Sequence, residues 1–461
     1  MGSESARLGA SFRDPSGFLF QRDQRLYRQV NRAYQADYDR LIGSGLYDEL
    51  ADAGLLIRHR ETDAAPEDPA LAFRVIEPEP VSFISYPYEW SFGQFQAAAL
   101  TTLEIQKRAL AKGMSLKDSS AYNIQFQRGQ PLLIDSLSFE AYREGEPWDA
   151  YRQFCQHFLA PLALMANTDI RLSQLLRVYI DGIPLDLASR LLPRRTRFSF
   201  ALLSHLHLHA ASQRRYADKA VDRTQVRRRM SRTSFLGLID NLASAVRKLS
   251  WKPAGTEWGS YYEVHNYTEA GLAHKQQVVD RFLDLASPQS VWDLGANTGL
   301  FSQQASRRGI PTVAFDIDPA AVELNYRDTK SRADTQMLPL VSDLTNPSPA
   351  LGWSNRERMS LLDRAPAGAV MALALVHHLA IGNNVPLPEV ARFFRELAPW
   401  LLVEFVPKQD SQVQRMLATR LDIFDRYDRA GFEQAFGQQY RTEEAIDLQD
   451  SERTLFILKR L

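Results

Sequence analysis

Short apolar runs recur at helix-length intervals through the second half of the sequence, and this alternation constrains the fold most. Polar residues, glycine or proline bound each run, and the runs are Ser290–Leu294, Thr312–Phe315, Leu338–Val341, Ala369–Val376 and Leu401–Phe405. Strands buried on both faces read as continuous apolar runs, and strands joined through helices lie parallel. The pattern therefore predicts a mostly parallel α/β sheet, closed at one edge by an antiparallel strand from the tail 451–458.

A loop with two glycines follows the first of these runs. The apolar strand reaches Asp293, passes through Gly295, Asn297 and Gly299, and enters a helical segment. Glycine has no Cβ, so its backbone can approach a ligand closely, and asparagine tolerates positive φ better than other side chains. The spacing does not fit the dinucleotide fingerprint G-x-G-x-x-G. We expect the loop to lie under a small ligand at the carboxyl end of its strand.

Acidic residues follow the next two runs. Asp316 ends the second run, Asp343 follows the third, and Asp318 is placed to cap the helix that starts at Pro319. The loop D-x-G-x-x-x-G with these strand ends resembles the class I S-adenosylmethionine-dependent methyltransferases, from Trp258 to the C-terminus. The resemblance implies a Rossmann-like sheet and S-adenosylmethionine as the cofactor. It places the cofactor against Asp293, Gly295, Asn297 and Gly299, its ribose hydroxyls at Asp316, and its adenine amino group near Asp343.

The fourth run leads into His377-His378-Leu379. This ending is similar to that of the small-molecule and glycan branch of the class, whereas amino-directed DNA methyltransferases have D/N-P-P-Y/F there. His377 and His378 are therefore the candidate catalytic residues, because a histidine whose pKa lies near neutral pH could remove a proton from the acceptor. A buried structural histidine explains them equally well. Tyr267, in the aromatic stretch before the first sheet helix, is a candidate cofactor contact, although packing onto the sheet also explains it.

The N-terminal half carries a second constellation, formed by Asp118, Asn123 and Asp135. Their spacing beside short apolar runs resembles the catalytic loop and metal-binding aspartate of aminoglycoside-phosphotransferase-like kinases. No glycine-rich phosphate loop precedes them, and Arg28 is the nearest basic residue on a predicted strand. We expect residues 1–190 to form a mixed α/β, kinase-like domain with a vestigial site; a chance match in a different fold is the alternative. The strands predicted here are 17–21, 26–30, 72–76, 81–85, 124–126 and 132–134.

Residues 191–250 are expected to form a basic helical connector between this domain and the methyltransferase domain 251–461. Its arginines are Arg194, Arg195, Arg197, Arg214, Arg215, Arg227, Arg228, Arg229 and Arg232. A solvated surface explains them better than a phosphate- or nucleic-acid-binding one. His205, His207 and His209 lack a nearby third ligand, so we expect no metal there. The amphipathic stretch 235–249 is expected to dock one domain on the other.

Composition narrows the function classes. The 55 basic and 55 acidic residues cancel, which disfavours nucleic acid as a partner, and no apolar stretch is long enough to span a membrane. The single cysteine, Cys155, fits a reducing compartment, so a cytoplasmic location is expected. The sequence thus predicts a methyltransferase that needs no metal and acts on a small-molecule or glycan acceptor. A bifunctional kinase–methyltransferase, a catalytically silent cofactor-binding scaffold and an RNA methyltransferase are the alternatives; acceptor and oligomeric state stay open.

Overall fold

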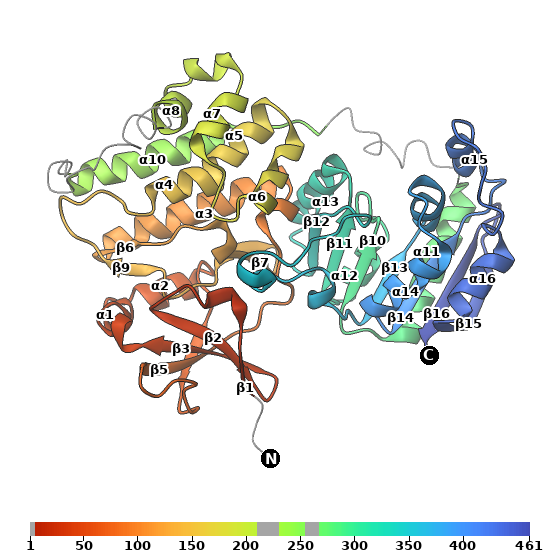
Figure 1. Ribbon diagram of the computed structural model, residues 1–461, viewed down its shortest axis with the longest axis horizontal. Coiled ribbons are helices and arrows are strands. Elements are labelled where there is room, and N and C mark those ends of the chain that lie inside the picture. Colours follow the sequence, from red (N-terminus) through yellow and green to blue (C-terminus); the bar gives the residue numbers. More distant parts are fainter. Residues whose placement is uncertain (1–4, 210–229, 254–266) are drawn as a thin grey trace. The chain divides into compact units, whose positions relative to one another are not determined.

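The computed structural model describes residues 5–209, 230–253 and 267–461, which form two compact units (Figure 1). Unit 1 comprises Met1–Lys252 together with Ala350–Arg358, and unit 2 comprises Pro253–Pro349 together with Met359–Leu461. The arginines at 214, 215 and 227–229 and the aromatic stretch 258–266 lie outside the described residues.

Unit 1 begins with a five-stranded antiparallel sheet in the order β1-β2-β3-β5-β4. The strands are β1 (Ser5–Arg7), β2 (Gly17–Arg22), β3 (Arg25–Asn31), β4 (His59–Thr62) and β5 (Ala72–Pro78), with helices α1 (Gln35–Gly43) and α2 (Leu46–Asp52) between β3 and β4. The strands predicted at 17–21, 26–30 and 72–76 are confirmed. The strand predicted at 81–85 is wrong, because the backbone of Ser85 is hydrogen-bonded to the side chain of Gln125 instead of to a neighbouring strand.

The rest of unit 1 is mainly helical and is built around α3 (Phe92–Ala111). Helix α3 begins at a capping box, in which Ser91 Oγ accepts from Gln94 N and Gln94 Oε1 accepts from Ser91 N. The other elements are β6 (Met114–Leu116), β7 (Ile124–Gln127), β8 (Gln130–Leu133), β9 (Phe139–Ala141), α4 (Tyr151–Phe154), α5 (Ala160–Asn167), α6 (Leu175–Val178), α7 (Leu185–Leu191), α8 (Phe200–Leu202) and α10 (Arg232–Lys248). The strands predicted at 124–126 and 132–134 correspond to β7 and β8.

Helix α10, which contains most of the amphipathic stretch, belongs to unit 1. The side chain of Gln96 on α3 donates to the carbonyl oxygens of Val246 (2.8 Å) and Leu249 (2.9 Å). Lys107 on α3 pairs with Asp240 on α10 at 3.0 Å. Helix α10 therefore packs against α3 within the first unit, with its apolar residues Ile239, Leu242 and Val246 buried.

Unit 2 is organised on a seven-stranded sheet in the order β12-β11-β10-β13-β14-β16-β15. Its strands are β10 (Val291–Leu294), β11 (Thr312–Asp316), β12 (Met337–Val341), β13 (Ala369–Ala372), β14 (Trp400–Phe405), β15 (Tyr440–Asp447) and β16 (Thr454–Arg460). The five predicted parallel strands are confirmed. The tail forms the antiparallel strand β16, but its predicted position at the edge is wrong, since β16 lies between β14 and the edge strand β15.

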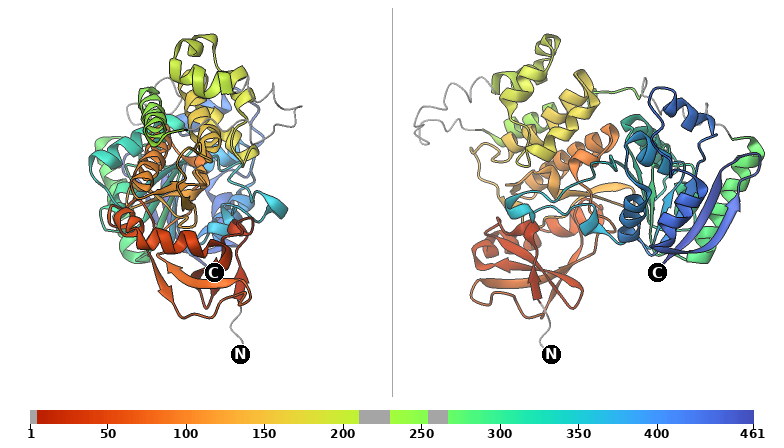
Figure 2. Two further views of the ribbon diagram at one scale, coloured as in Figure 1. Left: turned by 90° about the vertical axis from the view of Figure 1, so that its left-hand side faces the viewer. Right: turned by 45° about the vertical axis from the view of Figure 1, so that its right-hand side comes forward.

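Helices cover both faces of this sheet (Figure 2). They are α11 (Glu269–Ala286), α12 (Ser302–Ser306), α13 (Pro319–Ser331), α14 (Leu387–Leu397), α15 (Ser411–Leu417) and α16 (Arg429–Gly437). On β14, Leu402 packs in the core cluster beneath α11. Three residues later, Phe405 packs against Phe432 of α16, with the ring centroids 5.2 Å apart. Alternate residues of one strand thus serve the two faces. No described helix is long and apolar enough to cross a membrane.

The strand order reverses direction at β10. The chain moves from β10 outward through β11 to β12, and then returns to the other side of β10 for β13 and β14. In open α/β sheets, ligands bind in the crevice outside the carboxyl ends of the strands at such a switch point. With its antiparallel β16 inserted beside β14, unit 2 has the Rossmann-like fold of the class I methyltransferases.

Candidate functional site

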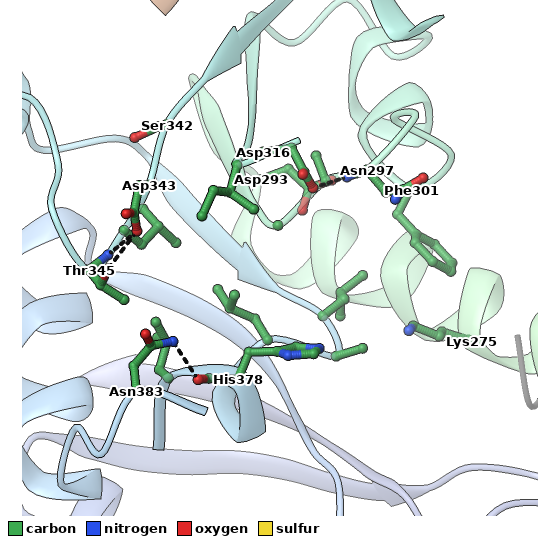
Figure 3. A pocket seen from close by; sticks show the side chains of 18 of the residues that line it. Lys275, Asp293, Asn297, Phe301, Asp316, Ser342, Asp343, Thr345, His378 and Asn383 are labelled. Atoms are coloured by element: carbon green, nitrogen blue, oxygen red, sulfur yellow. Dashed lines mark hydrogen bonds between the residues drawn. The ribbon is translucent and has the colours of Figure 1, made fainter. Parts of the chain in front are cut away.

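A cavity of about 330 Å³ opens at the switch point of unit 2 (Figure 3). Its walls come from the carboxyl ends of β10, β11, β12 and β13 and from α11, and they are formed by Tyr267, Lys275, Asp293, Gly295, Ala296, Asn297, Phe301, Asp316, Ile317, Ser342, Asp343, Leu344, Thr345, Leu373, Ala374, Leu375, His378, Leu379 and Asn383. The volume is within the range of small-molecule sites. The site residues predicted from the sequence in this unit all belong to the wall except Gly299 and His377.

The glycine loop is held against the end of β11. The amides of Gly295 and Ala296 both donate to the carbonyl oxygen of Phe315 at 2.9 Å, and the amide of Asn297 donates to Asp316 Oδ2 at 2.7 Å. Gly295 and Asn297 have φ angles of 76° and 51°, as the sequence predicts for this loop. The loop and the acidic strand end are therefore one hydrogen-bonded structure.

Gly299 has a different role from the one expected. Its φ is 82°, and a Cβ on it would lie 2.5 Å from the side-chain nitrogen of Asn325 on α13. The missing side chain thus makes room for α13 and does not face the cavity. Gly299 permits the close approach of helix and loop.

We expect Gly299→Ala to destabilise unit 2 by about 2–4 kcal/mol, combining about 1–2 kcal/mol for a left-handed backbone with overpacking against Asn325. Gly309→Ala is the matched control, because Gly309 has a φ of 78° and nothing lies within 4 Å of its added Cβ. Chemical denaturation of both variants measures the difference. Equal losses would show that the contact with Asn325 costs nothing.

Asp316 is buried at the end of β11 and accepts two backbone hydrogen bonds. Oδ2 accepts from Asn297 and Oδ1 accepts from the amide of Asp318 at 2.8 Å. Burial raises the pKa of Asp316 to about 6. Each carboxylate oxygen can accept a further donor, so this group can still bind hydroxyls in the cavity. Asp318 caps α13 through Ala320, as expected.

Two further acidic residues of the wall, Asp293 and Asp343, also accept hydrogen bonds from neighbouring residues. Asp293 Oδ2 accepts from the hydroxyl of Ser302 at 2.5 Å, which ties β10 to α12, and burial raises the pKa of Asp293 to about 7. Asp343 Oδ1 accepts from the amide (2.8 Å) and the hydroxyl (2.7 Å) of Thr345, which forms a turn after β12. Both side chains nevertheless border the cavity.

A buried network of charges lies beside the glycine loop, and the sequence analysis missed it. Lys275 on α11 donates to Glu404 Oε2 on β14 at 2.6 Å and to the hydroxyl of Tyr267 at 2.9 Å. That hydroxyl donates to Glu404 Oε1 at 2.5 Å and accepts from Arg453, whose Nε donates to Asp410 at 2.7 Å. Lys275 and Tyr267 belong to the cavity wall, so the network forms part of the site.

Electrostatics within this network favour the ionised form of Glu404. Burial raises the pKa of Glu404, but Lys275 and Arg453 outweigh this effect and bring it to about 2. The pKa of Lys275 is lowered, because burial outweighs the opposing effect of Glu404. The sequence does hold one signal: Glu404 interrupts the apolar run 401–406, and a carboxylate in a buried strand needs a cationic partner.

The two histidines lie differently from each other. His378 borders the cavity, whereas His377 is buried behind it, and the Nδ1 atom of His377 has no hydrogen-bond partner among the described residues. Burial, followed by the charge of Arg453, lowers the pKa of His378 to about 4, and burial also lowers the pKa of His377. The expectation that these histidines have a pKa near neutral pH is therefore wrong for both.

In unit 1, the kinase-like residues lie close together around Arg28 of β3. Arg28 pairs with Asp135 at 2.7 Å and with Asp14 at 3.2 Å. Burial and the charge of Asp135 raise the pKa of Asp118, which is also hydrogen-bonded to Asn123. Asp118, Asn123 and Asp135 thus lie near one another, and Arg28 beside them is already paired with two carboxylates. No group of residues able to hold a metal ion is found in the described parts of the chain.

Comparisons with known proteins give one extensive match and several partial ones. No protein-family model matches the chain. The bifunctional kinase–methyltransferase WbdD is 16% identical with a TM-score of 0.31, and the match covers 42% of this chain and 40% of that one. Magnesium protoporphyrin IX methyltransferase (ChlM) from Synechocystis PCC 6803, solved with bound SAH, is 16% identical with a TM-score of 0.31, covering 44% of this chain and 93% of that one.

The extensive match is to the nodulation protein NoeA of Rhizobium meliloti (strain 1021). The two chains are 37% identical over 462 residues, and the match covers 98% of this chain and 96% of NoeA. Both units described above are therefore shared with that relative. The chain belongs to the family of the protein NoeA.

Proposed function

We propose that this protein transfers a methyl group from S-adenosylmethionine to a small-molecule or glycan acceptor, and that the cavity of unit 2 is the site. The observation that carries the proposal is the joining of the glycine loop to Asp316 at the switch point of a class I methyltransferase sheet. A nucleoside ligand needs a buried acceptor for its ribose hydroxyls and space beside it, and this arrangement offers both. The cavity volume of about 330 Å³ fits a cofactor of this size.

The residues of the wall match the parts of the cofactor in chemistry. Asp316 would accept the ribose hydroxyls, and the neighbouring Ile317 and Leu344 offer apolar surface to the adenine ring. Lys275 and Asp293 both border the cavity, and the ammonium group partly offsets the rise in the pKa of Asp293 that burial causes. An ammonium group and a carboxyl group side by side suit the amino acid end of the cofactor, which carries one charge of each sign, because a bound ammonium group would favour the ionised form of Asp293.

Bound S-adenosylmethionine supplies a methyl group that is already activated by the sulfonium charge. The chain's own contribution is to align the acceptor with that group. Because its pKa lies near 4, His378 is neutral at pH 7 and suits the orienting of a hydroxyl or amine by accepting its hydrogen bond. It is a poor base at this pH, so in this proposal the acceptor loses its proton to water.

Calorimetric titration of the full chain with S-adenosylmethionine and S-adenosylhomocysteine tests the proposal. We expect both to bind with dissociation constants of about 1–100 μM, as small cofactors commonly do. The second step is transfer of a labelled methyl group from the cofactor to the small-molecule and glycan fractions of an extract. Failure of both ligands to bind would remove the proposal; binding without transfer to any fraction would favour the silent scaffold.

A bifunctional kinase–methyltransferase is the second candidate function. In that case unit 1 would be the kinase. A kinase uses its strand cation to hold phosphate groups. Here Arg28 occupies that strand and is paired with Asp14 and Asp135. We therefore propose that unit 1 serves recognition or regulation. Magnesium-dependent phosphorylation that is lost in Asp118→Ala would favour the bifunctional enzyme instead.

A further inference from the structure

Unit 1 exposes large apolar side chains on one helical corner. Phe198 is 92% exposed, Phe200 75% and Leu208 57%. Side chains of this size are normally buried, and a group of them on a surface indicates an interaction site. We define the 194–208 patch as Phe198, Phe200 and Leu208 together with Arg194, Arg195 and Arg197. Figure 1 shows α7, which precedes this segment, and α8, which lies within it, at the end of unit 1 away from its five-stranded sheet.

The exposure does not come from a loosely held chain, because His207 fixes the corner. His207 is buried; its Nδ1 lies 2.8 Å from the hydroxyl of Ser189 on α7, and its Nε2 lies 2.9 Å from the hydroxyl of Thr196. The Thr196 hydroxyl donates to the carbonyl oxygen of Pro193, so it accepts from Nε2–H, and Nδ1 accepts from Ser189. This neutral tautomer satisfies both ring nitrogens and holds the segment on α7.

His205, the other buried histidine of this segment, also has hydrogen-bond partners at both ring nitrogens. His205 Nδ1 lies 2.7 Å from the hydroxyl of Tyr151, and its Nε2 lies 2.8 Å from the side chain of Asn241 on α10. The ring of His209 stacks on Tyr151 at 5.4 Å. The histidines therefore build the corner, and the polar chemistry of its outer surface comes from the arginines.

Three arginines lie next to the apolar side chains of the patch in the sequence. Arg194, Arg195 and Arg197 are exposed, and none of them forms an ion pair with another described residue. Arg195 donates only to the carbonyl oxygen of Asn167, at 3.0 Å. The acidic residues of the neighbouring helices are already paired, Asp186 with Arg190 and Asp169 with Arg171. The patch thus presents cations that no described acidic residue pairs with, next to exposed aromatic rings.

We propose that the 194–208 patch docks the protein on the surface of an anionic phospholipid membrane. Phenylalanine and leucine side chains gain by entering the boundary between headgroups and acyl chains, and arginines beside them gain from anionic lipid. Leu208 cannot stack on a base, and the balanced charge of the whole chain gives no broad field for nucleic acid, so RNA fits the patch less well. This inference is independent of the reaction proposed for unit 2.

Sedimentation of the full chain with lipid vesicles tests the proposal. We expect binding to vesicles of phosphatidylcholine with about one third phosphatidylglycerol, and weak binding to phosphatidylcholine alone, because the arginines need the anionic headgroup. The variant Phe198→Ser/Phe200→Ser should lower the partition coefficient at least about tenfold, since both rings lose their apolar contact with the lipid. Arg194→Gln/Arg197→Gln should remove the preference for the anionic vesicles.

Leu421→Ser is the matched control, because Leu421 is 85% exposed in unit 2, outside the patch, and its loss should leave vesicle binding unchanged. Circular dichroism checks that each variant stays folded, which surface positions permit. The proposal is overturned if the wild-type chain does not bind anionic vesicles. It is also overturned if Phe198→Ser/Phe200→Ser binds them with the same partition coefficient as the wild-type chain. Self-association or RNA binding that the same variants abolish, without vesicle binding, would assign the patch to those partners instead.

Discussion

Glu404→Ala is expected to destabilise unit 2 by about 3–5 kcal/mol, because it leaves buried cations without their partner. Glu404 accepts from Lys275 and Tyr267 and lies 3.4 Å from Arg453. Lys275 would be left buried with only a hydroxyl for its ammonium group, and burial already lowers its pKa. Hydrogen exchange of the amides of β14 and calorimetric unfolding of the full chain measure the loss.

Two comparison variants separate the charge from the packing. Glu404→Gln keeps the shape and one acceptor, so it should lose stability while retaining the position of β14. Lys275→Met/Glu404→Leu removes both charges with similar volumes and should recover a large part of the stability, since buried ion pairs are often replaceable by apolar residues. If Glu404→Ala unfolds at the wild-type temperature and exchanges its β14 amides equally slowly, the network does not stabilise the unit.

The parallel sheet of unit 2 could be predicted because its strands are buried on both faces. Such strands read as continuous apolar runs, and each is followed by a helix-length segment. The edge strand β15 was missed because Tyr440–Asp447 is largely polar and half of its residues face solvent. A polar strand of this kind gives no period-two signal, and only its pairing with β16 identifies it.

The candidate site was predictable where it depends on backbone conformation or on strand ends. Gly295, Asn297, Asp316 and Asp343 follow from local sequence, and the structure brings all four to one cavity. The reason for Gly299 was not predictable, because the atom that it avoids belongs to Asn325, on a helix later in the chain. A spacing pattern shows that a glycine is needed but does not show what it makes room for.

Contacts between distant segments explain the rest of what the sequence did not reveal. The charge network joins Tyr267 and Lys275 to Glu404 and Arg453, and these residues meet only because β16 lies beside β14. The expectation of a near-neutral pKa for His377 and His378 was wrong for the same reason. Their lowering comes mainly from burial, which depends on the packed structure and is not visible in the motif.

Asp316→Ala is expected to weaken binding of S-adenosylhomocysteine by about 1–3 kcal/mol, which is roughly a 5- to 150-fold higher dissociation constant. The carboxylate is the buried acceptor proposed for the ribose hydroxyls, and its loss also frees the amide of Asn297 in the glycine loop. Asp318→Ala is the matched control, since Asp318 caps α13 through Ala320 and is not part of the cavity wall. That variant should lose stability without losing affinity.

A ligand that lacks one hydroxyl separates ribose recognition from a general collapse of the loop. The wild-type chain should bind 2′-deoxy-S-adenosylhomocysteine more weakly than S-adenosylhomocysteine, because the carboxylate then has one donor fewer. Asp316→Ala should bind the two ligands almost equally, since the acceptor that distinguishes them is gone; the four titrations form a thermodynamic cycle whose coupling energy reports the contact. If the variant still prefers the hydroxylated ligand by the wild-type factor, Asp316 does not bind the ribose, and its part in the site is limited to holding the glycine loop through Asn297.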